Sequence, residues 1–209
     1  MATLTLQPDD TTAKDAYILS DSPTTNTDGN GYMVVGENNA AVSVTRGLIQ
    51  FDLSSIPAGS TIDSATLYLT LREAGSFRAS NNRTMRAYRL LQNWVEAQAT
   101  WNIYSTGNNW GTAGAGNTTT DREATDIGTV AMATTDADES EKTITLTASK
   151  IQEMITGGSF TNNGFLLQMD TETDDQYQFY DSTVATSTKR PKIVVNYTLS
   201  ATGNFFAFM

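Results

Sequence analysis

Apolar and polar residues alternate with a period of two along most of the chain, and this alternation restricts the fold more than any other feature. It is clearest in IDSATLYLTL, residues 62–71, where Ala65, Leu67, Leu69 and Leu71 share one face. Successive side chains of a β-strand point to opposite faces, so this pattern predicts a half-buried strand.

The same pattern recurs in shorter segments throughout the sequence. They are TLTLQ (3–7), RGLIQFDL (46–53), MRAYRLL (85–91), KTITLT (142–147), FLLQMD (165–170), YQFYDS (177–182) and KIVVNYTL (192–199). With 15–19, 33–36 and 126–132, they make roughly ten or eleven short strands. The chain is therefore predicted to be all-β, a jelly-roll β-sandwich of about ten antiparallel strands.

Only the segment 147–158, TASKIQEMITGG, has a helical pattern. Ser149 and Gln152 have the spacing of a capping box, and the glycines at 157–158 supply a stop. Its apolar stripe consists of Ile151, Met154 and Ile155. A helix of about two turns is too short to stand alone, so we expect it to close one end of the sandwich.

Composition excludes several kinds of chemistry. Among 209 residues there is no cysteine and no histidine, so disulfides, thiolate or imidazole metal sites, and Ser-His or Cys-His nucleophile pairs are excluded. Oxygen groups remain, which suit calcium or a glycosidase carboxylate pair. The net charge of −10 and the pI near 4.3 argue against a nucleic-acid partner.

No composition break or internal repeat divides the chain, so residues 1–199 are predicted to form one domain, followed by a tail at 200–209. No apolar run has the length of a membrane span, and the first ten residues show no signal peptide. The tail is unusual because it is aromatic, with Phe205, Phe206, Phe208 and Met209. We expect it to dock, either on its own sandwich or, as slightly favoured, on another subunit.

Several motifs spread over residues 15–199 resemble one family. They are DAYI at Asp15, VVG at Val34, RGLIQFDLSSIP at 46–57, the I-x-x-A-x-L-x-L run from Ile62, W-x-E at Trp94, TWN at Thr100, GF at Gly164, FYDS at Phe179 and RPKIVVNY at 190–197. The set resembles the DNRLRE family of β-sandwich domains, which includes modules related to disaggregatase and modules that bind alginate or similar acidic polysaccharides. The literal string DNRLRE is absent. The resemblance implies a jelly-roll sandwich, usually without catalysis, that binds polysaccharide or acts as a structural and adhesive module.

The tryptophans allow two interpretations. Trp94 and Trp101 lie in the motif positions beside predicted strands, and we expect them to fill the core. Trp110 lies in a Gly/Asn loop, where its ring could stack on a sugar while Tyr104, Asn108 and Asn109 supply hydrogen bonds. The equally weighted alternative is a ring folded back onto the sheet.

The acidic segment 170–181, DTETDDQYQFYD, is a candidate calcium site formed by Asp170, Glu172, Asp174 and Asp181. Asp175 stands where an EF-hand loop requires glycine, and the flanks are strands, so an EF-hand is rejected. A solvated acidic hairpin is favoured over a calcium site of another kind. The carboxylates Glu96, Asp121, Glu123 and Asp126 could in principle form a catalytic pair, but no motif supports an enzyme.

Two functions of different classes follow. In the favoured one, the chain is a non-catalytic structural or adhesive surface protein of an assembled particle, most plausibly a phage virion, which attaches to glycans. In the other, it is a stand-alone carbohydrate-binding module for an acidic polysaccharide. Either role places it on a virion or a cell-exterior surface, with protein subunits or polysaccharide as partners and calcium as its one candidate cofactor.

Overall fold

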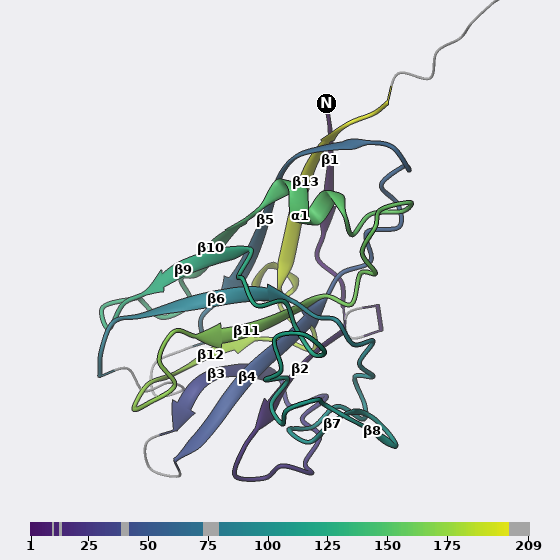
Figure 1. Ribbon diagram of the computed structural model, residues 1–209. Coiled ribbons are helices and arrows are strands. Elements are labelled where there is room, and N and C mark those ends of the chain that lie inside the picture. Colours follow the sequence, from purple (N-terminus) through teal and green to yellow (C-terminus); the bar gives the residue numbers. More distant parts are fainter. Residues whose placement is uncertain (10, 13, 39–41, 73–79, 201–209) are drawn as a thin grey trace, which may run out of the picture.

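All the strand ladders are antiparallel in the computed structural model (Figure 1), which describes residues 1–9, 11–12, 14–38, 42–72 and 80–200. One sheet has four strands in the order β1-β13-β5-β10. Their bounds are Ala2–Leu6 (β1), Lys192–Thr198 (β13), Thr61–Thr70 (β5) and Glu141–Leu146 (β10).

The second sheet has seven strands in the order β12-β3-β4-β11-β6-β9, with β2 paired to β4. Their bounds are Gln176–Tyr180 (β12), Tyr32–Asn38 (β3), Ser43–Gln50 (β4), Phe165–Met169 (β11), Arg83–Arg89 (β6), Gly128–Met132 (β9) and Lys14–Leu19 (β2). Two short strands, Ile103–Ser105 (β7) and Asn108–Asn109 (β8), pair with each other to form a separate two-stranded ribbon. The predicted antiparallel β-sandwich is confirmed, with thirteen strands among the described residues.

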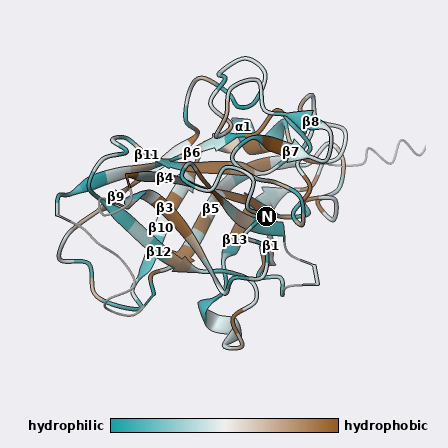
Figure 2. Cartoon of the chain, turned by 90° about the horizontal axis from the view of Figure 1, so that it is seen from below, coloured by the Kyte–Doolittle hydropathy of each residue, from teal (hydrophilic) through white to brown (hydrophobic). Residues whose placement is uncertain are grey.

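The apolar side chains of β5 form one wall of the main apolar core. Ile62, Ala65, Leu67 and Leu69 are buried, while the residues between them are exposed or half-buried. Leu67 is registered with Ile193 of β13 and Ile144 of β10, so one row of apolar side chains crosses the four-stranded sheet. Across from this row lie side chains of the second sheet, such as Ile49 and Leu167. Figure 2 shows hydrophobic residues concentrated in the strands and hydrophilic residues in the loops.

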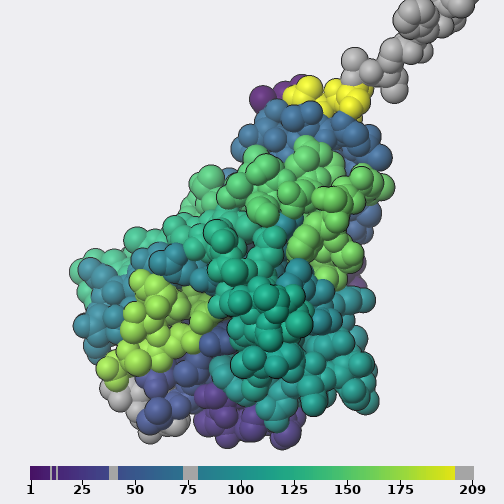
Figure 3. All heavy atoms as spheres, viewed as in Figure 1, coloured from purple at the N-terminus to yellow at the C-terminus, as the bar shows by residue number. Residues whose placement is uncertain are grey.

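A second apolar cluster lies on the other face of the seven-stranded sheet. Strand residues Ile18, Leu48 and Leu166 are fully buried there, together with Trp94 and Trp110 from the segment that follows β6. In Figure 3 the teal residues of that segment spread over this face. The seven-stranded sheet is therefore covered on both faces, and we call the second layer the outer cluster.

The helix α1 is shorter than predicted, Ala148–Gln152, and a 3-10 turn follows later at Ser187–Lys189. The predicted capping box is wrong, because Thr147 is the N-cap and its side chain makes no capping bond. The apolar stripe is buried in the main core as expected. Gln152 ties the helix to β5, because its side chain accepts from the Ile62 N–H and donates to the Ser60 carbonyl, both at 2.7 Å. In the described part of the chain, no helix is long and apolar enough to span a membrane.

Candidate functional site

The Trp110 ring does not face outward. Its side chain is 4% exposed, and its indole N–H donates to the Thr100 carbonyl at 2.9 Å. The Tyr104 ring packs against it, with centroids 5.4 Å apart and planes inclined by 56°. The prediction of a sugar-stacking platform is therefore wrong in its central residue, because the ring belongs to the outer cluster. Asn108 and Asn109 are exposed at the ribbon beside it.

Asp121 holds the loop that follows Trp110 in place. This carboxylate is fully buried and accepts hydrogen bonds from the backbone N–H groups of Gly111, Thr112 and Asn117, at 2.7, 3.0 and 3.0 Å. The loop is thus organised around an internal anion instead of presenting its N–H groups to a ligand. Trp101 is half-buried beside the outer cluster, and the Arg46 guanidinium lies 5.1 Å from its ring centroid.

The four predicted calcium ligands do not converge. Asp170 is exposed and accepts from the Thr84 N–H, whereas Glu172 forms a two-bond ion pair with Arg46 at 2.7 and 2.8 Å. Asp174 is exposed with a left-handed backbone (φ 63°). Asp181 is buried and accepts hydrogen bonds from the N–H and the hydroxyl of Thr183. Over the described residues, no group of three or more acidic side chains is arranged to hold a metal ion.

The carboxylates considered for catalysis each form hydrogen bonds or an ion pair with a neighbouring group. Glu123 makes two bonds to the buried Arg89, at 2.6 and 2.9 Å, and Asp126 pairs with Arg86 at 2.8 Å. Glu96 accepts from the backbone N–H of Asp15 at 2.6 Å. The remaining predicted site, the tail with Phe205, Phe206, Phe208 and Met209, lies outside the described residues.

A groove not predicted from the sequence lies where four segments meet at one end of the sandwich. Its central cavity has a volume of about 530 Å³. Four segments line it: Thr12 and Lys14 at the start of β2, Gln50, Asp52 and Ser54 at the end of β4, Met154, Ile155 and Thr156 after α1, and Phe160, Thr161 and Asn162 before β11. We call it the Lys14 groove. Most of its lining side chains carry hydroxyl, amide or charged groups, to which Phe160 and Met154 add apolar surface.

Two further cavities adjoin this one. A neighbouring cavity of about 210 Å³ shares Phe160 and Thr161 with it, and another of about 550 Å³ shares Thr12 and Asp52. The three cavities therefore adjoin one another on the surface, and we call them together the track. A track of this kind suits an extended chain molecule better than a compact ligand.

Lys14 is the central cation of the track. Its ammonium donates to the Gln50 side-chain carbonyl at 2.8 Å and lies 4.5 Å from the ring centroid of Trp94. Burial lowers the Lys14 pKa to about 8, and the negative charge of Glu96 opposes this shift. The other lysines, Lys142, Lys150, Lys189 and Lys192, each pair with a carboxylate. Within the described residues, Lys14 is the lysine that has no such ion pair.

A relay of hydrogen bonds fixes the groups around Lys14. The Gln50 amide donates to the Asn162 carbonyl at 2.5 Å, and the Asn162 amide donates to the Phe51 carbonyl at 2.8 Å. Trp94 is fully buried, as expected for a core residue, and its indole N–H donates to the Asn163 carbonyl at 3.0 Å. The floor of the groove is therefore preorganised, which reduces the ordering cost of binding.

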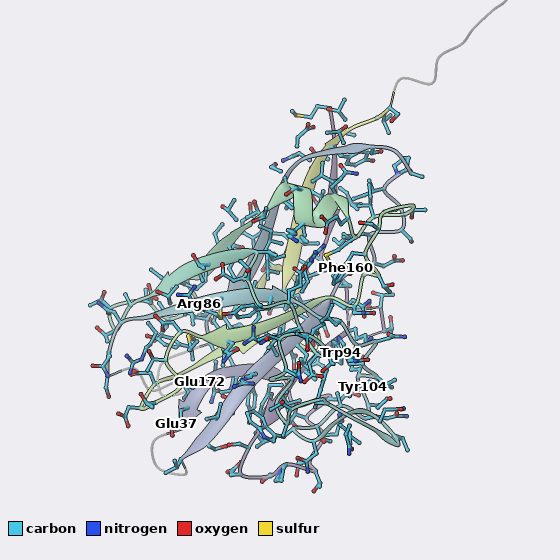
Figure 4. All side chains as sticks on the ribbon, in the orientation of Figure 1. Glu37, Arg86, Trp94, Tyr104, Phe160 and Glu172 are labelled. Carbon is cyan, nitrogen blue, oxygen red and sulfur yellow. The ribbon has the colours of Figure 1, made fainter. Side chains whose placement is uncertain are left out.

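Phe160 marks the junction between two cavities of the track. The Arg89 guanidinium lies 3.8 Å from its ring centroid and is held by Glu123 and Glu153. Figure 4 shows Phe160 above Trp94 in this view. Sequence reasoning missed this site because its residues come from distant segments. A weak signal was available, since Gln50 is polar at an outward position of the strand RGLIQFDL.

The comparisons with known proteins agree with the fold. Residues 15–195 match the family model described as the disaggregatase related repeat domain. No curated protein matches the chain. The chain belongs to the disaggregatase-related family, and this membership indicates a polysaccharide-binding or surface module.

Proposed function

We propose that this chain is a non-catalytic surface module that binds an acidic polysaccharide along the Lys14 groove. The observation that carries the proposal is a lysine that forms no ion pair with a carboxylate and lines a largely polar cavity, which adjoins two further cavities. The amides of Gln50 and Asn162 and the threonine hydroxyls on the walls offer donors and acceptors for sugar hydroxyl groups. Lys14 supplies the positive charge that a uronate carboxylate would meet.

The net charge of −10 does not prevent such binding. At physiological ionic strength, charges more than about 8 Å apart are largely screened, so carboxylates far from the groove contribute little to the potential at Lys14. Glu96 is close enough to act on Lys14, and its charge favours the protonated ammonium. Asp52, on the wall of the groove, is the acidic residue among the residues that line the central cavity. It accepts from the Ser54 N–H at 2.9 Å, a bond that lowers the pKa of Asp52 and keeps it ionised. We therefore expect modest affinity and a clear dependence on the position of each carboxylate in the glycan.

Replacement of the ammonium gives the direct test. Lys14→Met retains the aliphatic stem over Trp94 and removes the charge. A charge-assisted hydrogen bond contributes about 1.5–3 kcal/mol, so affinity for a polyuronate should fall about tenfold or more. Calorimetric titration with polyuronates of defined length, and with a neutral glucan of equal length, measures the loss.

Lys192→Met is the matched control, because Lys192 is paired with Glu141 and does not line the groove. It removes the same charge from the whole protein and should leave affinity unchanged. Equal losses in both variants would show that only the overall charge matters. Binding of the neutral glucan as tightly as the polyuronate would contradict the proposed role of Lys14.

A role as a subunit of an assembled particle, such as a phage virion, is a second proposal. It is supported by the aromatic residues Phe205, Phe206 and Phe208 of the tail. Native mass measurement of the full chain, and of a variant ending at Ser200, tests it. The full chain should be oligomeric and the shortened chain monomeric with an unchanged melting temperature. A full chain that is monomeric by itself and does not co-sediment with particles would contradict this role.

A further inference from the structure

A second, smaller cleft lies between two branches of the seven-stranded sheet. β4 pairs with β3 only over residues 43–45, and with β2 over residues 45–50. Beyond these residues β3 pairs with β12, so the pairs β2-β4 and β3-β12 diverge. The cleft between them has a volume of about 170 Å³ and shares no lining residue with the Lys14 groove or its extensions.

The wall of the cleft is aromatic and polar. Tyr17 and Tyr32 stack with ring centroids 5.9 Å apart, and the Arg72 guanidinium lies 4.6 Å from the Tyr32 centroid. Arg72 also donates to the side-chain carbonyl of Gln178 at 2.6 Å. Burial, and then the neighbouring Tyr32, raise the Tyr17 pKa to about 12, so its phenol stays neutral and can both donate and accept.

Ser43 is the observation that points to a ligand. This residue lines the cleft and is 3% exposed, and its hydroxyl has no hydrogen-bond partner. Native proteins pair nearly all of their buried polar atoms, either with protein groups or with bound water or ligand. A hydroxyl in this position can donate one hydrogen bond and accept two.

The charges around the cleft favour an uncharged occupant. Asp21 contributes one carboxylate to the lining, and Arg72 brings one guanidinium against Tyr32 and Gln178. Because Arg72 is engaged by these two groups and does not line the cleft, the lining offers an acidic ligand no cation, whereas Lys14 lines the Lys14 groove. The volume lies below the ~300–1,000 Å³ of sites for drug-sized molecules and leaves room for one ring.

We propose that this cleft is a separate binding site for a single neutral pyranose, held by the hydroxyl of Ser43 and the amides of Gln176 and Gln178. The site is independent of the polysaccharide proposed for the Lys14 groove. It would recognise an uncharged sugar at a chain end or a branch, which supplies ring hydroxyls to these groups without requiring an ion pair. Affinity in the millimolar range is expected for one ring in so small a site.

Amide chemical shifts in ¹⁵N-labelled full-length protein test this proposal with methyl pyranosides of glucose, galactose and mannose. At least one should cause saturable shifts confined to residues 32–36, 43–45 and 176–178, while glucuronate at equal concentration should cause weaker ones. Ser43→Ala should weaken binding about fivefold or more, because it removes a donor and acceptor of the ligand. Its unfolding midpoint should be unchanged or higher, since it also removes an unpaired buried hydroxyl.

Lys14→Met is the matched control. It should leave these chemical-shift changes unchanged, whatever its effect on polyuronate binding in the Lys14 groove. If Ser43→Ala does not fold, Gln176→Ala at the half-exposed wall gives the same test. The proposal is overturned if none of the sugars shifts these amides, or if binding is equal in the wild type and in both cleft variants. A high-resolution crystal structure with only an ordered water on Ser43, grown in the presence of the sugars, would also overturn it.

Discussion

Asp15 lies next to Lys14, and it makes the stability of the fold depend on pH. The carboxyl is 5% exposed and accepts from the N–H and the hydroxyl of Ser182, both at 3.1 Å. Burial raises the Asp15 pKa to about 7, and the charges of Asp181 and Glu96 act in the same direction. The hydrogen bonds from Ser182 oppose this shift.

The sign and size of the effect follow from linkage. The folded state keeps the Asp15 proton to a higher pH than the unfolded state, whose pKa is near 3.8. Stability from this group is therefore fully present below about pH 4 and is lost as the pH rises through about 7. A difference of about three pKa units corresponds to at most ~4 kcal/mol of unfolding free energy.

Asp15→Asn removes the titration and keeps the shape. The amide oxygen can accept from the Ser182 N–H, and the amide nitrogen can donate to the Ser182 hydroxyl. We expect wild type and variant to be equally stable near pH 4, and the variant to be about 2–4 kcal/mol more stable near pH 8. Urea unfolding across this range measures the difference. Asp63→Asn, at an exposed position of β5, is the control and should show no such divergence.

A stability difference between wild type and Asp15→Asn that does not change with pH would contradict the raised pKa of Asp15. So would a variant that is less stable than the wild type near pH 8. Either result would mean that the Asp15 carboxylate is stabilised in the folded state by a group that compensates for its burial.

Three further outcomes are expected. Trp110→Ala should lower the unfolding free energy by about 3–5 kcal/mol, as for a large core residue, and a loss below ~1 kcal/mol by urea unfolding would mean that the ring is exposed. Asp121→Ala leaves three backbone N–H groups without their acceptor, so it should lower the unfolding free energy by more than about 2 kcal/mol and increase amide hydrogen exchange at residues 111–117. The control Asp63→Ala should show neither effect. Polyuronate affinity should fall as the pH rises through about 8, where Lys14 loses its proton, and Lys14→Met should show no such fall.

The sandwich could be predicted because the alternation of side chains is a local property that the strand pairing preserves. In β5 the residues assigned to one face from the sequence, Ala65, Leu67 and Leu69, are the ones buried against the second sheet. The helix cap was harder to predict than the strands. Gln152 bonds to the start of β5, 90 residues away in the sequence, instead of capping the N-terminus of its own helix. Tertiary contacts override local propensity in such a short helix.

The loop around Trp110 allowed an outward or an inward ring, and the structure shows the inward one. The sequence held a signal for this outcome. Residues 47–49 and 165–167 form continuous apolar runs, whereas a strand with one solvated face should alternate. Leu48 and Leu166 therefore required a cover on the outer face, and Trp110 is part of that cover. The loop's own composition, rich in glycine and asparagine, does not decide the orientation of the ring, because its apolar partners lie far away in the sequence.

This cover has a consequence for where a glycan can bind. Residues 94–121 occupy part of the outer face of the seven-stranded sheet, and the four-stranded sheet covers the other face. Binding surface is then left mainly at the ends and seams of the sandwich, where strands begin, end or diverge. The Lys14 groove lies at the start of β2 and the end of β4. The smaller cleft lined by Ser43 lies where the pairing between β3 and β4 ends. Lys14 and Ser43 belong to the adjacent strands β2 and β4, so a substitution that shifts the register between these strands should disturb both sites together.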